Sequence, residues 1–213
     1  MSPDAPWPEV RARIQQRLAP PDAWDPAGGT SASDYDLNPR YRPPEARTRR
    51  PAAVLVPIVE HDDGPTILLT RRADALARHA GQVAFPGGRA DDGEAPWETA
   101  LREAHEEVGL EPERVTVAGL ARPYETATGF VVTPVVGFVR PGFTPKPDPA
   151  EVAEVFEAPF AFLMDSSSYE ERSQVFAGAE RFYYAVSHGD QLIWGATAGM
   201  LRGLREQLFG EAA

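Results

Sequence analysis

Three glutamates with helical spacing are the residues of this chain whose types and positions most directly indicate chemistry. Glu103, Glu106 and Glu107 share one side of a helix if residues 95–108 are helical, because positions three and four apart are neighbours there. Like charges at this spacing repel one another, and a bound cation relieves that repulsion. Carboxylate oxygens suit Mg²⁺ or Mn²⁺, whereas zinc prefers histidine or cysteine. The spacing therefore predicts a magnesium or manganese site.

The loop before this helix carries residues that fit the same site. Gly87 and Gly88 have no side chains, so a phosphate or a backbone segment can approach closely, and we expect both to contact a substrate. Glu94 and Arg102 can form an ion pair that fixes the loop against the helix. We interpret this pair as structural support for the ligands rather than as catalytic.

A glutamate-rich helix face exposed to solvent is the alternative explanation, and the three glutamates alone would favour it. The pattern, however, extends over residues 88–110 and places glycine, glutamate and arginine at defined intervals. A pattern with that many specified positions rarely arises by chance. We therefore favour a functional site.

The overall charge limits the partners of the protein. The 213 residues carry a formal net charge of −11, with 32 acidic side chains against 21 lysines and arginines. Such a chain lacks the basic footprint of a non-specific nucleic-acid binder, so we expect no nucleic-acid partner. A polyanionic substrate is compatible with this charge if bound cations and local arginines attract it. A small-molecule nucleotide whose phosphates bind the protein through a metal ion meets that condition.

Other global features bear on the compartment. The chain has no cysteine, which excludes disulfide scaffolds, thiolate metal sites and cysteine nucleophiles. Its first residues lack the basic start and apolar run of a signal peptide, and no stretch approaches the roughly 20 apolar residues that span a bilayer. These features favour a cytoplasmic protein without a membrane partner. The sequence gives no indication of an oligomeric state.

Local patterns divide the chain into an arm and a domain. Proline, glycine, serine and aspartate dominate residues 19–51, so we interpret residues 1–48 as an N-terminal helix with an extended arm and residues 49–213 as the folded domain. Periodicity predicts helices at residues 8–18, 96–108, 159–164 and 197–208. It predicts strands at residues 52–59, 66–72, 83–85, 114–120, 130–139, 154–158, 182–187 and 191–194. This alternation indicates an α/β fold with a mixed sheet covered by helices on both faces.

Aromatic residues occur in two further segments. Phe182, Tyr183, Tyr184 and Trp194 lie on apolar strand patterns, which favours core positions over a base-stacking platform. Residues 123–130 are rich in aromatic and hydroxyl groups, and they fit a pocket wall or a plain loop equally well.

Residues 88–110 resemble the signature of the Nudix hydrolases at every specified position. The resemblance implies a Nudix-type α/β/α sandwich, a loop-helix-loop metal site, and hydrolysis of a nucleoside diphosphate linked to another group. By position in the signature, Glu103 and Glu107 would be metal ligands, and Glu106 a further ligand or the catalytic base. In some Nudix enzymes the base lies beyond this helix, where Glu154 is the first candidate here and Glu151 the second. We rank Glu106 ahead of Glu154.

A second resemblance covers residues 68–73, Gly81 and residues 85–88. These residues resemble a signature that is typical of coenzyme A pyrophosphatases within that superfamily. That signature carries another arginine where this chain has Ala77, next to Arg78. The resemblance implies hydrolysis of coenzyme A and its derivatives to 3′,5′-ADP and (acyl-)4′-phosphopantetheine. We expect Arg72 and Arg78 to bind phosphates of this substrate.

Two other interpretations stay open. The same chemistry can act on ADP-ribose, NADH or a dinucleoside polyphosphate, and a substrate screen separates these compounds. An alternative of another class is a non-catalytic, nucleotide-sensing module with the Nudix fold. Such modules often lose the glutamates that this chain retains.

Overall fold

The computed structural model describes the chain except residues 26–28, 31, 44–48, 77–78, 177 and 211–213. Its α-helices are Trp7–Arg17 (α1), Pro96–Val108 (α2), Phe160–Met164 (α3) and Ala196–Phe209 (α4). The larger sheet contains Ala32–Ser33 (β1), Arg50–His61 (β2), Gly64–Arg72 (β3), Val83–Ala84 (β4), Gly87–Arg89 (β5), Val115–Leu120 (β6), Tyr124–Glu125 (β7), Phe130–Val139 (β8) and Val152–Pro159 (β9). The smaller sheet contains Glu170–Phe176 (β10), Ala179–His188 (β11) and Gln191–Trp194 (β12). Within the described part, no helix is long and apolar enough to cross a membrane.

Strand β2 organises the larger sheet. It pairs in parallel with β8 along residues 50–59, and on its other side it pairs antiparallel with β5 and then with β3. The strand order is β1-β7-β8-β2-β3-β4, and β5, β6 and β9 join as additional partners of β2, β8 and β3. Parallel and antiparallel pairs in one sheet confirm the mixed sheet expected from the sequence.

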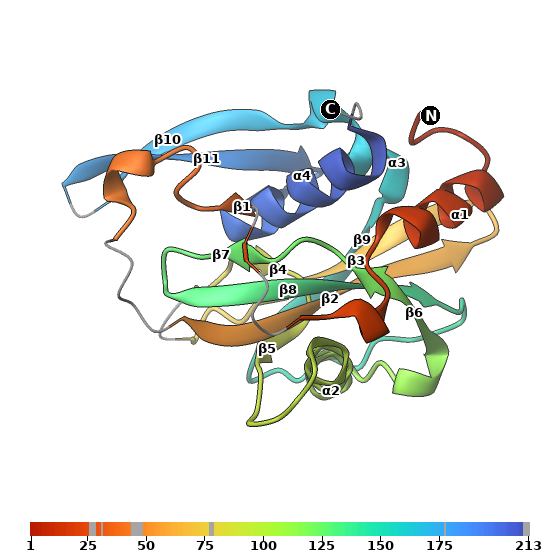
Figure 1. The fold of residues 1–213 in the computed structure, drawn as a ribbon. Coiled ribbons are helices and arrows are strands. Elements are labelled where there is room, and N and C mark those ends of the chain that lie inside the picture. The colour runs from red at the N-terminus through yellow and green to blue at the C-terminus, as the bar shows by residue number, and fades with distance from the viewer. Residues whose placement is uncertain (26–28, 31, 44–48, 77–78, 177, 211–213) are drawn as a thin grey trace.

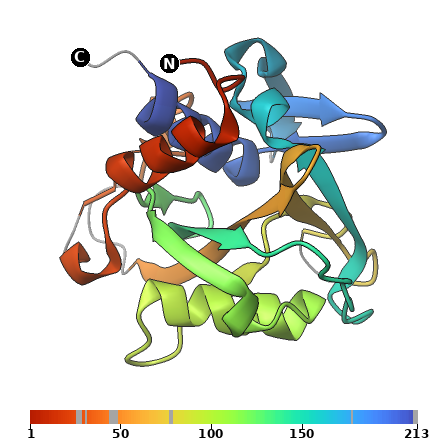
Figure 2. The same ribbon diagram turned by 90° about the vertical axis from the view of Figure 1, so that its right-hand side faces the viewer.

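Helices cover both faces of this sheet (Figures 1 and 2). On one face α2 packs through Ala104 and Val108, both fully buried. On the other face α1, α3 and α4 share a second apolar cluster, which includes Ile14, Phe138 and Leu201. The α/β/α arrangement predicted from the sequence is therefore confirmed, and α2 is the helix that carries the glutamates.

The N-terminal segment lies against the rest of the chain (Figure 1). Val10 and Ile14 of α1 are buried in the same cluster as α4. Strand β1 pairs in parallel with β7. Farther along, the Asn38 side chain exchanges hydrogen bonds of 2.8 and 2.9 Å with the backbone of Phe182 in β11. Residues before position 49 thus help to build the core and the edges of the fold.

One expectation about the C-terminal region is confirmed and one is wrong. The strands expected at residues 182–187 and 191–194 pair antiparallel as β11 and β12, and β11 begins at Ala179 and also pairs with β10. The prediction that Phe182 lies in the core is wrong, since 36% of its surface is exposed. The β10–β11 hairpin extends beyond α4, the helix that covers its other end (Figure 1). Tyr184, closer to that helix, is partly buried against the core.

Candidate metal and phosphate site

Helix α2 presents its glutamates along a flank because the local sequence fixes both of its ends. Pro96 opens the helix, and Glu98 Oε2 accepts a hydrogen bond from the Ala95 amide at 2.8 Å, which caps the first turn. Gly109 ends the helix with a φ of 69°, a conformation that glycine adopts readily. The apolar face of α2 packs on the sheet, so the flank with the glutamates runs beside β5.

Strand β5 passes close to two of the glutamates. Gly88 leaves no room for a side chain, since a Cβ atom there would lie 2.6 Å from the Glu103 carboxylate. The Gly87 amide donates a hydrogen bond to Glu107 Oε2 at 3.2 Å. A Cβ atom on Gly87 would lie 2.5 Å from the Ala53 carbonyl oxygen in β2. Gly88 is therefore needed for the close approach of β5 to α2, and Gly87 for the close approach of β5 to β2.

Glu107 is the most buried of the three glutamates, with 4% of its surface exposed. Burial raises its pKa to about 7, although the Gly87 amide and the Arg72 charge act in the opposite direction. Burial also raises the pKa of Glu103, against an opposing hydrogen bond from Arg102. The negative charges of both carboxylates are thus poorly compensated, which favours a cation between them.

Glu106 lies on the solvent side of this pair, and its side chain is 58% exposed. Arg102 Nη1 donates to Glu103 Oε1 at 2.9 Å and to Glu106 Oε2 at 3.1 Å. Among the described residues, no three histidine, cysteine or acidic side chains are grouped so as to hold a metal ion as they stand. The structure therefore brings Glu103 and Glu107 to β5 and leaves Glu106 bound to an arginine.

Arg102 also forms the ion pair expected with Glu94. Its Nε and Nη2 atoms donate to the two Glu94 oxygens at 2.8 and 3.0 Å, and these bonds lower the pKa of Glu94 to about 2. Thr99 Oγ1 donates to Glu94 at 2.8 Å, a contact that the sequence pattern did not reveal. Arg102 Nη2 further donates to the Arg89 carbonyl oxygen at 3.3 Å. One guanidinium thus holds the loop, β5 and α2 together.

Arg72, at the end of β3, lies beside the buried carboxylate. Its Nη1 atom is 3.9 Å from Glu107 Oε1, and its buried Nε atom has no hydrogen-bond partner within the described part of the chain. An unpaired guanidinium donor next to a candidate metal ligand suits a phosphate oxygen. Arg78, the other arginine expected at the substrate, lies outside the described residues.

The two candidate bases beyond α2 occupy different places. Glu154 accepts a hydrogen bond from Gln191 of β12 at 3.0 Å, which places its side chain with the small sheet. Glu151, by contrast, lies near enough to Glu103 and Glu107 for its charge to contribute to the raised pKa of both. Glu151 is therefore the better placed of the two beside the carboxylates of α2, and the choice of base stays a prediction.

The loop before β9 brings Glu151 to this place. The amides of Lys146 and Asp148 donate to the carbonyl oxygens of Val108 and Glu107, each at 2.9 Å, so the loop docks on the end of α2. These bonds join segments that are far apart in the chain. No local pattern in the sequence signals them.

The donor set fits a hard divalent cation. Glu103, Glu107 and Glu151 offer carboxylate oxygens alone, and the chain has no cysteine. Mg²⁺ usually keeps several waters and bridges one or two carboxylates to substrate phosphates, so it does not need a closed cage. The unpaired Arg72 donor supplies a place for such a phosphate. The residues present therefore fit Mg²⁺ or Mn²⁺.

Comparisons with known proteins show which family and which solved structures the chain is similar to. A family model described as the NUDIX domain matches residues 48–176. NudL of Pectobacterium atrosepticum, described as an uncharacterized Nudix hydrolase, is 41% identical over 198 residues, which cover 89% of this chain and 97% of that protein. NudL of Cronobacter sakazakii, with the same description, is 44% identical over 161 residues, or 75% of this chain and 83% of that protein. Among solved structures, a MutT/nudix family protein from Enterococcus faecalis covers 94% of this chain and 73% of its own, with 15% identity and a TM-score of 0.48.

Proposed function

Because the chain belongs to the Nudix hydrolases, enzymes that act on diphosphate derivatives of nucleosides, we propose that its substrate is coenzyme A or an acyl derivative. The products would be 3′,5′-ADP and 4′-phosphopantetheine or its acyl form. The observation that carries this proposal is the position of Arg72 beside Glu107. Arg72 belongs to the segment that resembles the coenzyme A pyrophosphatase signature, and this position brings it to the carboxylate site.

Glu103 and Glu107 would hold Mg²⁺ or Mn²⁺, with Glu106 or Glu151 as a further ligand. A divalent ion held there would offset the charge of the diphosphate and make the attacking water more acidic. Glu106 becomes available once its bond to Arg102 Nη1 is released. The other nitrogens of that guanidinium stay paired with Glu94, so the loop keeps its position.

Hydrolysis needs a base that accepts one proton from the attacking water. We assign this role to Glu106, which is exposed to solvent on the turn next to Glu103, and we take Glu151 as the second candidate in place of Glu154. The water oxygen forms a bond to one phosphorus, and the bond from that phosphorus to the bridging oxygen breaks. The bridging oxygen leaves with the other phosphate. Arg72 would offset the charge that develops on these oxygens.

A substrate screen with identified products tests this function. The purified protein receives coenzyme A, acetyl-coenzyme A, ADP-ribose, NADH or a dinucleoside polyphosphate, each with Mg²⁺ and with Mn²⁺. We expect the highest kcat/KM with coenzyme A or its acetyl form, and release of 3′,5′-ADP. A higher kcat/KM with one of the other compounds would show that this compound is the substrate, and the proposed hydrolysis of a diphosphate bond would stand. Tight binding without turnover of any compound would support the nucleotide-sensing module instead.

A further inference from the structure

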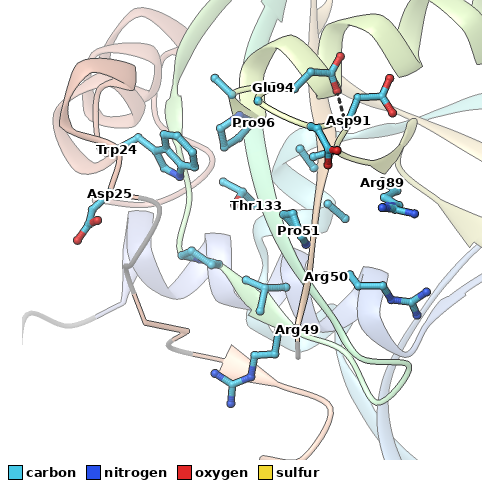
Figure 3. A pocket seen from close by; sticks show the side chains of 18 of the residues that line it. Trp24, Asp25, Arg49, Arg50, Pro51, Arg89, Asp91, Glu94, Pro96 and Thr133 are labelled. Carbon is cyan, nitrogen blue, oxygen red and sulfur yellow. Dashed lines mark hydrogen bonds between the residues drawn. The ribbon is translucent and has the colours of Figure 1, made fainter. Parts of the chain in front are cut away.

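A pocket of about 570 Å³ lies beside the N-terminal end of α2 (Figure 3). The N-terminal arm, the start of β2 and residues 89–96 form its walls. Its lining includes Ala53 of β2, which packs in the apolar cluster under α2, and Thr133 of β8. Pro123 also lines it, so the segment that the sequence left open between pocket wall and plain loop contributes to a cavity. The volume is in the range of small-molecule sites.

Among the residues that the structure describes, Arg50 and Arg89 of this pocket have no carboxylate partner. Arg50 donates one hydrogen bond to the Thr128 carbonyl oxygen at 3.2 Å, and its guanidinium lies 4.0 Å from the centre of the Phe130 ring. The Arg89 side chain forms no hydrogen bond or ion pair with any residue that the structure describes. The donors of both arginines are available to an anion.

The other groups of the pocket add different chemistry. Trp24 borders the side opposite Arg50 and Arg89 in Figure 3, and an edge contact with Trp97 at 6.2 Å holds its ring. Indole rings stack on nucleobases. Asp91 and Asp92 also line the pocket, and their carboxylates can accept hydrogen bonds from ribose hydroxyls or an exocyclic amine.

This combination discriminates between ligand classes. A simple polyanion would meet the repulsion of Asp91 and Asp92 as well as the attraction of the arginines. A nucleoside phosphate uses every group, because its base stacks, its hydroxyls and amine donate, and its phosphate accepts. The pocket therefore matches a nucleoside phosphate better than an inorganic anion.

The pocket adjoins the carboxylate site. Arg89 directly follows Gly88 in β5, so their Cα atoms are only about 3.8 Å apart. Arg102 connects the two places as well, since it donates to the Arg89 carbonyl oxygen at 3.3 Å and to Glu103 at 2.9 Å. The pocket and the carboxylate site thus share strand β5 and are bridged by the Arg102 guanidinium.

We propose that this pocket binds the phosphorylated nucleoside end of the substrate. The base stacks at Trp24, and the phosphate that is not hydrolysed binds Arg50 and Arg89. The inference rests on the proposed function, in which that phosphate is the 3′-phosphate of coenzyme A. It follows that the product 3′,5′-ADP binds in the same place.

Isothermal titration calorimetry with 3′,5′-ADP tests this assignment on the 213-residue chain without added metal. Arg50→Gln and Arg89→Gln should each weaken binding about tenfold, because charge-assisted hydrogen bonds to phosphate are lost. Arg172→Gln, on β10 and outside the pocket, is the matched control and should bind like the wild type. Adenosine 5′-monophosphate lacks the second phosphate. The two substitutions should therefore weaken its binding less than they weaken the binding of 3′,5′-ADP. Unchanged binding in both pocket variants, an equal loss in the control, or no binding to the wild type would overturn the assignment.

Steady-state kinetics with coenzyme A separates this inference from the proposed function. Arg50→Gln and Arg89→Gln should raise KM and leave kcat close to that of the wild type. Cleavage of coenzyme A with an unchanged KM in both variants would refute the pocket assignment alone. Binding of 3′,5′-ADP that depends on both arginines, in a protein that leaves coenzyme A intact, would refute the proposed function alone.

Discussion

The backbone amide of Gly87 donates a hydrogen bond to the buried carboxylate of Glu107 at 3.2 Å. Strand β5 thereby fixes the orientation of a side chain whose charge is poorly compensated, and Arg72 lies 3.9 Å from the other carboxylate oxygen. A ligand that is held in place before the ion arrives loses little freedom on binding. The proposed activity depends on this contact between strand and helix.

Glu107→Gln keeps the size of the side chain and an acceptor for Gly87 but removes the charge. We expect activity to fall about 100-fold or more, with an unchanged circular dichroism spectrum, because the ion loses a ligand. Initial rates over a range of Mg²⁺ concentrations measure the effect. Glu113→Gln, on an exposed turn outside the site, is the control and should keep wild-type rates. Equal rates in the two variants would remove Glu107 from the site.

Gly88→Ala introduces a methyl group 2.6 Å from the Glu103 carboxylate and should displace it. We expect the affinity for Mn²⁺ to fall about 10- to 100-fold, because a ligand leaves its position. Gly203→Ala in α4 is the matched control, since open space surrounds its Cβ position. Alanine there should stabilise the protein by up to about 1 kcal/mol and leave Mn²⁺ affinity unchanged. Titration calorimetry measures both affinities. An unchanged Mn²⁺ affinity in Gly88→Ala would contradict the close approach of β5 to Glu103.

The raised pKa of Glu107 should make metal binding depend on pH. In the metal-free folded protein this pKa is about 7, above the ordinary value of 4.5. The group therefore contributes stability that is complete below pH 4.5 and is lost as the pH rises through 7. A divalent ion binds the ionised form and releases the proton. A fixed Mg²⁺ concentration should thus raise Tm more at about pH 8 than at about pH 6.

Glu107→Gln provides the control for that pH dependence. The amide does not titrate, so the difference between the two pH values should become much smaller. Thermal unfolding with and without Mg²⁺ at each pH measures it. A wild-type response that is larger at the lower pH would contradict the assignment of this carboxylate as a ligand.

Glu151→Gln and Glu154→Gln distinguish the two carboxylates beyond α2. Glu151 adds its charge to the site, whereas the Glu154 side chain bonds to Gln191, so Glu151→Gln should lower kcat about tenfold or more, while Glu154→Gln should stay close to wild type. Parallel kcat and KM measurements decide the matter. A larger loss in Glu154→Gln would restore the original ranking.

The ion pair of Glu94 with Arg102 should contribute to folding. Bonds from Arg102 lower the pKa of Glu94 to about 2, so the contribution is present above pH 4.5 and is lost as the pH falls towards 2. Glu94→Gln should destabilise the protein by about 1 kcal/mol at neutral pH. Urea unfolding measures the free energy, and the difference from wild type should shrink in acid. A difference that is constant over this pH range would show that the ion pair is not its cause.

Local determinants explain which parts of the site the sequence predicts. Helix α2 follows from Pro96, Gly109 and its own apolar spacing, and the pairing of Glu94 with Arg102 follows from residues near one another in the chain. Gly88 of β5 could be anticipated because only a residue without a Cβ atom tolerates the approach of Glu103. Such features need no knowledge of distant segments.

Long-range contacts explain what the sequence pattern missed. Glu151 reaches the site because backbone bonds dock its loop on the end of α2, and backbone bonds leave no trace in residue types. The pocket unites Trp24 of the arm with Arg50 and Arg89 of separate strands. Phe182 is exposed although its pattern is apolar, because the strand continues past the helix that would cover it. Hydrophobic periodicity alone does not show where a covering element ends.

Anomalous diffraction from crystals soaked in Mn²⁺ tests most directly whether the carboxylates of α2 hold the ion. We predict a manganese peak about 2.1 to 2.3 Å from oxygens of both Glu103 and Glu107, with Arg102 withdrawn from Glu106 or with Glu151 completing the site. A manganese peak elsewhere, or none between these two glutamates in crystals of an enzyme that Mn²⁺ activates, would contradict the account.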